Sequence, residues 1–226
     1  MADGGVFELS SADGGWTEQI IYSTAVRQNG GLTMDAAGNI FGTGLTTAFE
    51  LSPNGAGGWN ATVLHVFTPH TYCGPDVTCP PVPAGNPLLD KAGNVYGVTY
   101  DGGPVCGKVY RLGKRSGKWQ EAVLYAFTGV NGDGCNPYGG LVFDASGNIY
   151  GTATADGAYG HGTIFELIAP VGRGNHKYTE KVLWNFNKTD GSTPFSGLTW
   201  DNAGNLYGTT YAGGSSDSGV VFELTP

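Results

Sequence analysis

The stretch GNIYGTATADGAYGHGTIFEL, residues 147–167, contains a phrase that this chain of 226 residues uses four times. The near-copies are GNIFGTG followed by TAFEL, GNVYGVT followed by KVYRL, and GNLYGTT followed by VVFEL. The asparagines of the four GN pairs stand at positions 39, 94, 148 and 205, at intervals of 55, 54 and 57 residues. A regular interval of this length predicts a repeat architecture, in which each unit buries its apolar faces by stacking on its neighbours.

Each unit reads as four short strands. In the third unit these are GGLVFD (139–144), NIYGTA (148–153), TIFEL (163–167) and EKVLWNF (180–186). Antiparallel four-stranded sheets that repeat along a chain and stack radially form a β-propeller. We therefore predict an all-β fold, a β-propeller of about four blades with four antiparallel strands each. Residues 1–226 then form a single domain of four repeats of ~55 residues.

The turn between the first two strands reads D-x-x-G-N in every unit, at 35–39, 90–94, 144–148 and 201–205. Its aspartate can accept hydrogen bonds from the turn backbone, and its glycine can take the left-handed conformation that closes a short hairpin. A calcium loop is the alternative, but each turn offers one carboxylate and one amide. We therefore interpret the turns as structural.

Aromatic residues recur at fixed places of the repeat. One set lies in the third strand, where the aromatic side chain and the following leucine point to the same side. We expect this set to pack between blades: Phe7, Phe49, Tyr110, Phe165 and Phe222. A second set precedes the fourth strand and is expected to act as structural wedges: Trp16, Trp59 and Trp119.

The last unit, GLTWDNAGNLYGTTYAGGSSDSGVVFELTP, resembles the unit of the GloVer tandem-repeat proteins, and its strand order is similar to that of NHL propellers. The resemblance covers essentially the whole chain. Because GloVer repeats occur on bacterial cell surfaces with varied anchoring signals, the resemblance implies a propeller in an extracellular or cell-surface protein. It implies no reaction, since no catalytic motif is shared across that family.

The third strand type occurs five times, at 6–9, 48–51, 109–112, 164–167 and 221–224, whereas the other types occur four times. We expect the N-terminal strands to pair into the C-terminal blade and so close the ring. One VFEL copy is then surplus, and it adds an outer strand, is displaced, or pairs with another molecule. There are two alternatives to a closed four-blade ring: the chain is a segment of a larger propeller, or two chains share one ring.

The composition contains 40 glycines, 12 prolines and 12% aromatic residues, as many short strands joined by tight turns require. The net charge of -8, with only 11 Lys and Arg, argues against nucleic acid or an anionic membrane surface as a partner. No apolar run is long enough for a transmembrane helix, and the opening MADGG does not resemble a signal peptide.

The four cysteines, at 73, 79, 106 and 135, all lie in polar segments rich in glycine and proline. Four cysteines allow three pairings. Zinc is the less favoured reading, because the CGPDVTC spacing is wider than a usual ligand pair and the other two cysteines stand alone. From the positions of the loops we predict the disulfides Cys73–Cys79 and Cys106–Cys135, typical of an oxidising compartment. We predict no metal and no cofactor.

The variable segments link strand two to strand three, and strand four to the next blade, which places them on one face of a propeller. Constant strands with diversified loops favour a binding face. Tyrosines beside Asp and Asn side chains suit a neutral sugar, which offers apolar ring faces and hydroxyls. The candidate contacts are His70, Tyr72, Asp76, Tyr100, Asp101, Asp133, Asn136, Tyr138, Asp156, Tyr159, His161, Asp190, Tyr211 and Asp217.

These observations predict an extracellular or cell-surface module that binds carbohydrate, such as a glycan or surface polymer. One alternative is a polysaccharide-active enzyme, a glycoside hydrolase or lyase, with Asp101, Asp156 and His161 as catalytic groups. It is not favoured, since no nucleophile elbow, phosphate loop or metalloprotease helix is present. Another is a structural surface repeat that assembles through the surplus strand. The chain is then a monomer or a strand-exchanged homo-oligomer.

Overall fold

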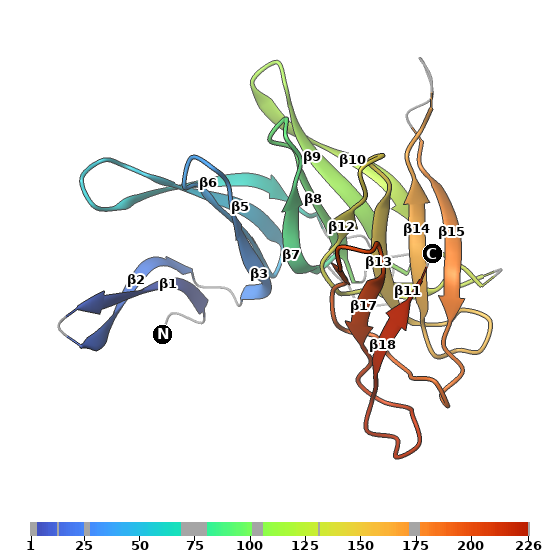
Figure 1. Cartoon of the computed structure of the whole chain (residues 1–226). Coiled ribbons are helices and arrows are strands. Elements are labelled where there is room, and N and C mark those ends of the chain that lie inside the picture. Colours follow the sequence, from blue (N-terminus) through green and yellow to red (C-terminus); the bar gives the residue numbers. More distant parts are fainter. Residues whose placement is uncertain are drawn as a thin grey trace, which may run out of the picture.

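The computed structural model describes residues 4–12, 14–24, 28–68, 81–100, 106–130, 132–171 and 177–225. Four antiparallel sheets follow one another along the chain as the blades of a four-blade β-propeller (Figure 1). We number them blade 1 to blade 4. A two-stranded hairpin precedes blade 1. Within the described ranges, no helix is long and apolar enough to cross a membrane.

The strands have the following bounds. The N-terminal hairpin consists of β1 (Gly4–Ala12) and β2 (Gly15–Thr24). Blade 1 consists of β3 (Gln28–Met34), β4 (Ile40–Gly44), β5 (Thr47–Pro53) and β6 (Trp59–Val66). Blade 2 consists of β7 (Pro83–Leu89), β8 (Val95–Thr99), β9 (Lys108–Arg115) and β10 (Lys118–Ala126). Blade 3 consists of β11 (Cys135–Pro137), β12 (Val142–Phe143), β13 (Ile149–Ala155), β14 (Thr163–Ile168) and β15 (Thr179–Asn185). Blade 4 consists of β16 (Thr199–Trp200), β17 (Leu206–Thr209) and β18 (Val221–Leu224).

The predicted D-x-x-G-N turns are confirmed as structural hairpin turns. In blade 3, Asp144 Oδ1 accepts hydrogen bonds from the backbone nitrogens of Ser146, at 2.8 Å, and Asn148, at 2.9 Å. Its other oxygen accepts a bond from Asn148 Nδ2 at 2.8 Å. The glycine of this turn, Gly147, has φ of 84°. The same bonds recur in the other three turns, so each carboxylate is used by its own turn.

The repeated phrases YGT and FEL fit together as a pair of strands. The glycine of the second strand lies directly opposite the aromatic residue of the third, as Gly151 does opposite Phe165. The aromatic ring lies over the glycine, so that a Cβ at Gly151 would come within 2.5 Å of Phe165 Cζ. The other blades have the same pair: Gly42 with Phe49, Gly97 with Tyr110, and Gly208 with Phe222.

Glycines also allow the first strands of neighbouring blades to approach each other closely. A Cβ at Gly85 would lie 2.7 Å from the backbone nitrogen of Gly140 in the next blade, and one at Gly139 would overlap the backbone of Ser196. The glycines of the first strand are therefore required by backbone-to-backbone packing between blades.

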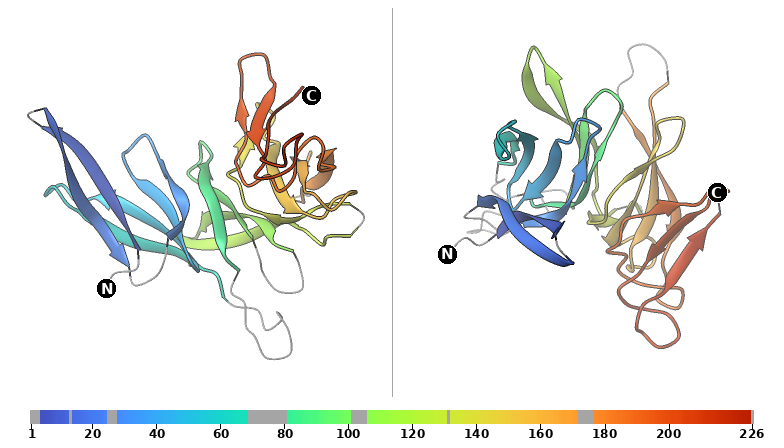
Figure 2. Two further views of the ribbon diagram at one scale, coloured as in Figure 1. Left: turned by 90° about the horizontal axis from the view of Figure 1, so that it is seen from below. Right: turned by 60° about the vertical axis from the view of Figure 1, so that its left-hand side comes forward.

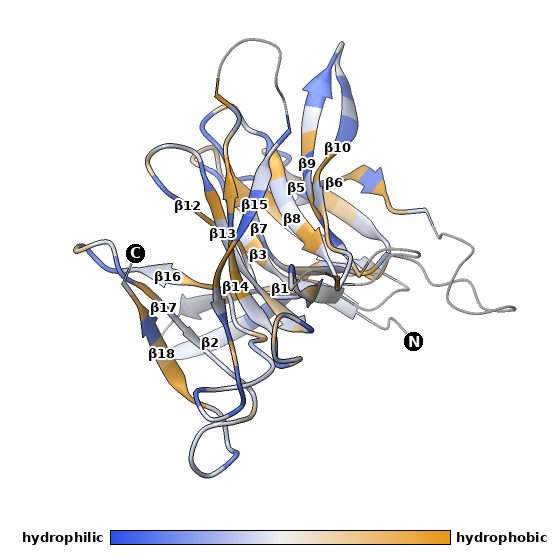
Figure 3. Cartoon of the chain, turned by 90° about the vertical axis from the view of Figure 1, so that its right-hand side faces the viewer, coloured by the Kyte–Doolittle hydropathy of each residue, from blue (hydrophilic) through white to orange (hydrophobic). Residues whose placement is uncertain are grey.

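The cores lie between successive blades. Phe41, Ala48, Leu64 and Phe67 of blade 1 pack on Val95, Tyr110 and Leu112 of blade 2. The largest cluster joins blades 2 and 3, and a third joins blades 3 and 4. Figure 3 shows hydrophobic residues along the inner strands and a hydrophilic far end of the β9–β10 hairpin. Phe49, Tyr110 and Phe165 are at most 2% exposed, as predicted for residues packed between blades.

The predicted closure of the ring is not confirmed. Within the described part of the chain, β1 pairs with β2 in a sheet of their own, and β16, β17 and β18 form a three-stranded sheet. The hairpin packs on blade 1 instead, because Val6 is buried with Ile40, Phe49 and Leu51. In Figures 1 and 2 the hairpin and blade 4 lie at opposite ends of the molecule.

Two residues of the hairpin differ from the prediction. Phe7 is 57% exposed and Trp16 is 73% exposed, whereas the equivalent Trp59 and Trp119 pack against their blades. The reason is that the hairpin contains only the third and fourth strand types. Among the described residues it has no second strand whose glycine would receive the ring of Phe7, and no blade covers this side.

Candidate functional site

The variable connections of blades 2, 3 and 4 meet on one face of the molecule. The backbone nitrogen of Asn136, in β11 at the start of blade 3, donates to the carbonyl oxygen of Cys106, in the β8–β9 connection, at 2.7 Å. The backbone nitrogen of Thr193, in the β15–β16 connection, donates to the carbonyl oxygen of His161 at 2.9 Å. Ser192 and Ala212 exchange two backbone hydrogen bonds. Neighbouring connections thus support one another, as the propeller topology predicts.

One of the two predicted disulfides is confirmed. Cys106 and Cys135 are bonded, with their Cα atoms 4.8 Å apart and a sequence separation of 29. Cys73 and Cys79 lie outside the described residues. The carboxylate of Asp156 lies near the Cys106–Cys135 bridge, within 4.8 Å of both sulfurs. Because both sulfurs are in a disulfide, they do not offer thiolates to a metal.

Four aromatic rings form a continuous series across these connections, which we call the aromatic row: Tyr100, Tyr138, Phe195 and Tyr211. Successive ring centroids are 5.7, 5.0 and 5.8 Å apart, and each pair meets edge to face. Tyr100 and Tyr138 are half-buried against the core of blades 2 and 3. Phe195 is 41% exposed and Tyr211 is 74% exposed. The row therefore starts in the core and ends in solvent.

The repeat places these rings at equivalent positions. Tyr138 and Phe195 each follow a proline, Pro137 and Pro194, just before the first strand of a blade. Tyr100 and Tyr211 each follow the second strand of a blade. Sequence reasoning identified the three tyrosines and missed Phe195. The signal that could have found it is the Pro-aromatic pair, which NPYGG and TPFSG share in the same register of the repeat.

Polar groups accompany the exposed end of the row. His161 Nδ1 lies 3.1 Å from Ser192 Oγ, which lies 3.3 Å from Thr193 Oγ1. The backbone nitrogen of Tyr211 donates to the carbonyl oxygen of Thr193 at 3.0 Å. The imidazole of His161 is the donor or the acceptor toward Ser192 depending on its tautomer. An imidazole and two hydroxyl groups thus stand beside the two most exposed rings.

Three predicted carboxylates form hydrogen bonds with groups of the protein itself. Asp133 Oδ2 accepts hydrogen bonds from the Tyr125 hydroxyl and from both the backbone nitrogen and the hydroxyl of Thr128, at 2.9 to 3.1 Å. Asp190 accepts from Trp184 Nε1 and from the backbone nitrogen of Asn187. Asp217 accepts from the backbone nitrogen of Gly213 and lies 3.5 Å from Lys188 Nζ. These carboxylates stabilise their own loops.

The remaining candidates are placed as follows. Asn136 and Asp156 have positive φ values of 58° and 56°, so both occupy turn positions. Tyr159 is 63% exposed in the β13–β14 connection. Four candidates lie outside the described residues: His70, Tyr72, Asp76 and Asp101. The distance between the two predicted catalytic carboxylates, Asp101 and Asp156, is therefore not described, because Asp101 is one of these four residues.

The structure brings together a different carboxylate pair, which sequence reasoning did not identify. Glu180 on β15 and Asp133 both lie near the hydroxyl of Tyr125 on β10. Burial, and then the charge of Asp133, raise the pKa of Glu180 to about 7. Burial and the same two carboxylates raise the pKa of Tyr125. Glu180 lies on the outer strand of blade 3 and Asp133 lies in the β10–β11 connection, and neither residue belongs to the aromatic row.

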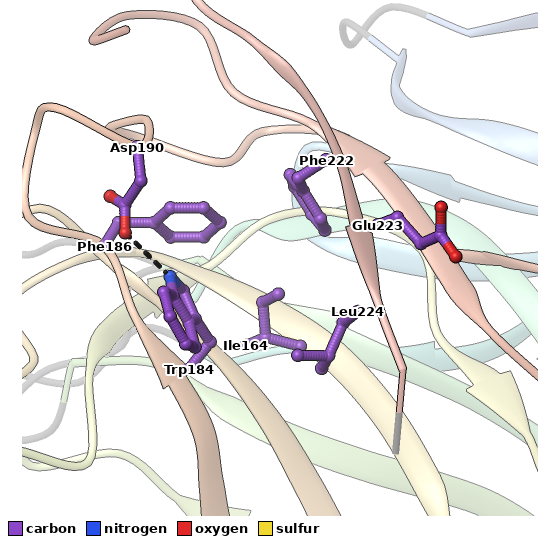
Figure 4. A pocket seen from close by; sticks show the side chains of 7 residues that line it. All are labelled: Ile164, Trp184, Phe186, Asp190, Phe222, Glu223 and Leu224. Atoms are coloured by element: carbon purple, nitrogen blue, oxygen red, sulfur yellow. Dashed lines mark hydrogen bonds between the residues drawn. The ribbon is translucent and has the colours of Figure 1, made fainter.

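A hollow of about 180 Å³ lies beside β18, between blades 3 and 4 (Figure 4). Its lining is mostly apolar: Ile164, Trp184, Phe186, Phe222 and Leu224, with Asp190 and Glu223. Figure 4 shows the Trp184–Asp190 hydrogen bond at one side of this hollow and Glu223 at the other. The hollow contains none of the aromatic row, which is an exposed surface and not an enclosed pocket.

Residues 46–226 match the model of the Gloeobacter/Verrucomicrobia repeat. Among solved structures, the chain is similar to a candidate gluconolactonase (18% identity, TM-score 0.53, 93% of this chain and 68% of that one). It is also similar to a gluconolactonase of Xanthomonas campestris (18% identity, TM-score 0.51, 92% and 66%). A third similar structure is PorZ of Porphyromonas gingivalis, a surface component of the type-IX secretion system (13% identity, TM-score 0.50, 94% and 28%).

No curated protein sequence matches the chain. The identities to the solved structures are all low, so the likeness concerns the propeller fold and not the activity. The chain also spans only part of each similar structure, between 28% and 68% of its length.

Proposed function

Because the chain belongs to the Gloeobacter/Verrucomicrobia repeat family, we propose that it is an extracellular or cell-surface module that binds carbohydrate through its aromatic row. The observation that supports this is the edge-to-face series from Tyr100 to Tyr211, whose outer rings are exposed. Exposed large aromatic residues on a rigid support are a recurrent feature of binding surfaces.

The chemistry of the row suits a sugar chain. The faces of Phe195 and Tyr211 offer apolar area for the C–H faces of a pyranose ring, and the tyrosine hydroxyl can pair with a sugar hydroxyl. Thr193 and His161 add donors and acceptors beside these rings, and the buried hydroxyl of Ser192 holds both of them in place. The net charge of -8 disfavours an anionic polymer, so the ligand is a neutral glycan.

The support under the row is rigid. The Cys106–Cys135 disulfide ties the β8–β9 connection to the start of blade 3, next to Tyr138. Tyr100 and Tyr138 are held in the core of blades 2 and 3. A preorganised surface loses little conformational entropy when a ligand binds. The disulfide also supports an oxidising, extracytoplasmic compartment for the protein.

A glycan array with the purified chain tests the proposal, followed by titration of each hit by calorimetry. We expect Tyr211→Ala to weaken binding about tenfold or more, corresponding to about 1.4 kcal/mol or more. Its matched control is Trp16→Ala, since Trp16 is an equally exposed aromatic residue (73% against 74%) on the distant hairpin. Equal losses in both variants, or no glycan bound at all, would reject the aromatic row as the site.

The same hits are incubated with the protein and assayed for released reducing sugar, and gluconolactone hydrolysis is measured in parallel. We expect neither reaction. If reducing sugar is released and His161→Ala abolishes this release, the protein is a polysaccharide-active enzyme and not a binding module.

A further inference from the structure

Blade 4 has an unoccupied edge. Blades 1, 2 and 3 each have a fourth strand, β6, β10 or β15, paired to their third strand, but among the described residues nothing pairs with the outer edge of β18. Val221 on this strand is 79% exposed. The hollow of Figure 4 lies where a fourth strand would cover Phe222 and Leu224.

The N-terminal hairpin has the fourth strand that blade 4 lacks, together with a third strand of its own. Residues 6–9 and 221–224 have the identical sequence VFEL, so β1 is a third strand by sequence. The β1–β2 ladder has a register shift between Val6 and Phe7, as the third-to-fourth ladder of blade 1 has between Ala48 and Phe49. The hairpin is thus the outer half of a blade, that is, its third and fourth strands. Blade 4 contains the inner half, the first and second strands β16 and β17, together with the third strand β18.

The aromatic contacts between successive blades also indicate that blade 4 and blade 1 are complementary. Tyr96 on β8 meets Phe143 of the next blade edge to face at 5.0 Å, and Tyr150 on β13 meets Trp200 in the same way. The equivalent residue of β17 is Tyr207, and the described residues place no following blade beside it. The equivalent of Phe143 and Trp200 in blade 1 is Met34, which is 62% exposed. Each end of the molecule therefore has one half of the repeated contact.

The space between the hairpin and blade 1 leaves room for the first and second strands of a blade. A hollow of about 390 Å³ lies between the hairpin and blade 1, and its lining includes Val6, Phe7, Leu32 and Met34. In blades 2, 3 and 4, the second strand of the preceding blade covers the equivalent face. The hollow therefore lies at the place that a first and a second strand, such as β16 and β17, would take.

We propose that the β1–β2 hairpin of one copy of the chain completes blade 4 of a second copy. The hairpin replaces β18 beside β17, and blade 4 of the second copy then packs on blade 1 of the first. Phe7 comes to lie over Gly208, and Glu8 lies opposite Tyr207, in the register that Phe222 and Glu223 have in the free chain. Glu8 accepts a hydrogen bond from the Tyr207 hydroxyl, as Glu166 does from Tyr150.

We expect the hairpin to displace β18, and not to come apart itself, because the β1–β2 ladder is longer than the β17–β18 ladder. Nine residue pairs join β1 to β2, whereas four join β17 to β18. The hairpin therefore moves as an intact unit, and β18 is the strand that is released. The exposed side chains of Phe7 and Leu9, 57% and 53%, become buried in the completed blade. This inference is independent of the carbohydrate site, which lies on the loop face.

Mixed cross-linking of two single variants tests the proposal directly. Chains with Glu8→Cys and chains with Tyr207→Cys are mixed, oxidised with a glutathione buffer and separated without reducing agent. We expect a disulfide-linked pair of one chain of each kind. The register control replaces Tyr207→Cys by Thr209→Cys, which lies two residues along the same strand, and is expected to give at least fivefold less of the mixed product.

Light scattering after size exclusion gives the second measurement. The unaltered chain is expected to shift from monomer to larger species as its concentration rises. Phe7→Ser is expected to raise the concentration required at least tenfold without loss of folding, since Phe7 is exposed in the free chain. Phe7→Tyr is expected to restore assembly, because blade 2 has a tyrosine, Tyr110, at the equivalent place.

Two results would overturn the inference. One is a monomer at every concentration together with no mixed disulfide. The other is a monomeric chain with both cysteines, Glu8→Cys and Tyr207→Cys, that forms the disulfide within itself at high dilution. That result would mean that the hairpin closes the ring of its own chain.

Discussion

Replacing Gly151 by alanine will destabilise the protein, whereas the same change at Gly208 will not. Both glycines lie in the second strand of a blade, opposite the aromatic residue of the third strand. A Cβ at either position comes within 2.5 Å of the ring, Phe165 Cζ for Gly151 and Phe222 Cζ for Gly208. The initial clash is thus the same, and the outcome depends on whether the ring can move.

The surroundings of the two rings differ. Phe165 is 0% exposed and packs at 5.0 Å from Phe127 in the core of blades 2 and 3, so its ring cannot withdraw. Phe222 is half-buried on β18, which is an edge strand among the described residues. Its ring meets Phe186 at 5.2 Å but also lines the hollow beside β18, into which it can move. Overpacking a rigid core costs about 1–3 kcal/mol. Alanine in place of glycine restricts the unfolded chain and offsets about 0.4–1 kcal/mol.

The expected net loss for Gly151→Ala is therefore about 1–2 kcal/mol, and that for Gly208→Ala is about zero. Urea unfolding followed by tryptophan fluorescence and circular dichroism measures both, with unchanged m-values as the condition for comparing them. Equal stability of the two variants would refute the reasoning, since the rigidity of the buried ring would then have no effect. If only Gly208→Ala were destabilised, the core between blades 2 and 3 would be the more adaptable of the two.

Three further predictions concern the turns, the disulfide and the buried acid. Asp144→Ala removes three hydrogen bonds of its turn and is expected to cost about 1–3 kcal/mol in urea unfolding; Asp144→Asn, which keeps one acceptor oxygen, should lose less. The Cys106→Ala/Cys135→Ala double variant opens a loop of 29 residues and is expected to lose about 2–4 kcal/mol; an unchanged denaturation midpoint would contradict this. The pKa of Glu180 is raised to about 7, so the folded state holds its proton more tightly than the unfolded state does, and stability falls as pH rises from 4.5 to 7. After screening at this half-exposed site we expect a loss of about 1 kcal/mol, which Glu180→Gln removes; a wild-type profile that is flat over this range would contradict it.

The sequence predicted the elements of the fold well because most of the determining contacts are local. An aspartate, a glycine and an asparagine within five residues make each turn, as the bonds between Asp144 and Asn148 illustrate. The pairing of Cys106 with Cys135 followed from the order of the strands. Tyr100, Tyr138 and Tyr211 were found as candidate ligand contacts because they recur in variable segments that the topology brings to one face.

Other features depended on side-chain contacts that the repeat pattern does not specify. Asp133 and Asp190 looked like free loop carboxylates, but Tyr125 on β10 and Trp184 on β15 donate hydrogen bonds to them from the strands that lead into these loops. Phe195 entered the row only through its distances to Tyr138 and Tyr211. Single-sequence patterns do not tell which side chain, near or far along the chain, donates to a given acceptor or meets a given ring.

The repeat itself determined the strands, the turns and the pairing of a small residue with a ring, because these depend on hydrogen bonds and alternation over a few residues. Only the tertiary structure decided what each half-blade packs against. The two VFEL copies of residues 6–9 and 221–224 have the same local pattern, yet Phe222 lies over a glycine and Phe7 lies in solvent. The difference arises because β18 pairs with a second strand, β17, whereas among the described residues β1 pairs with β2 alone and packs Val6 against blade 1.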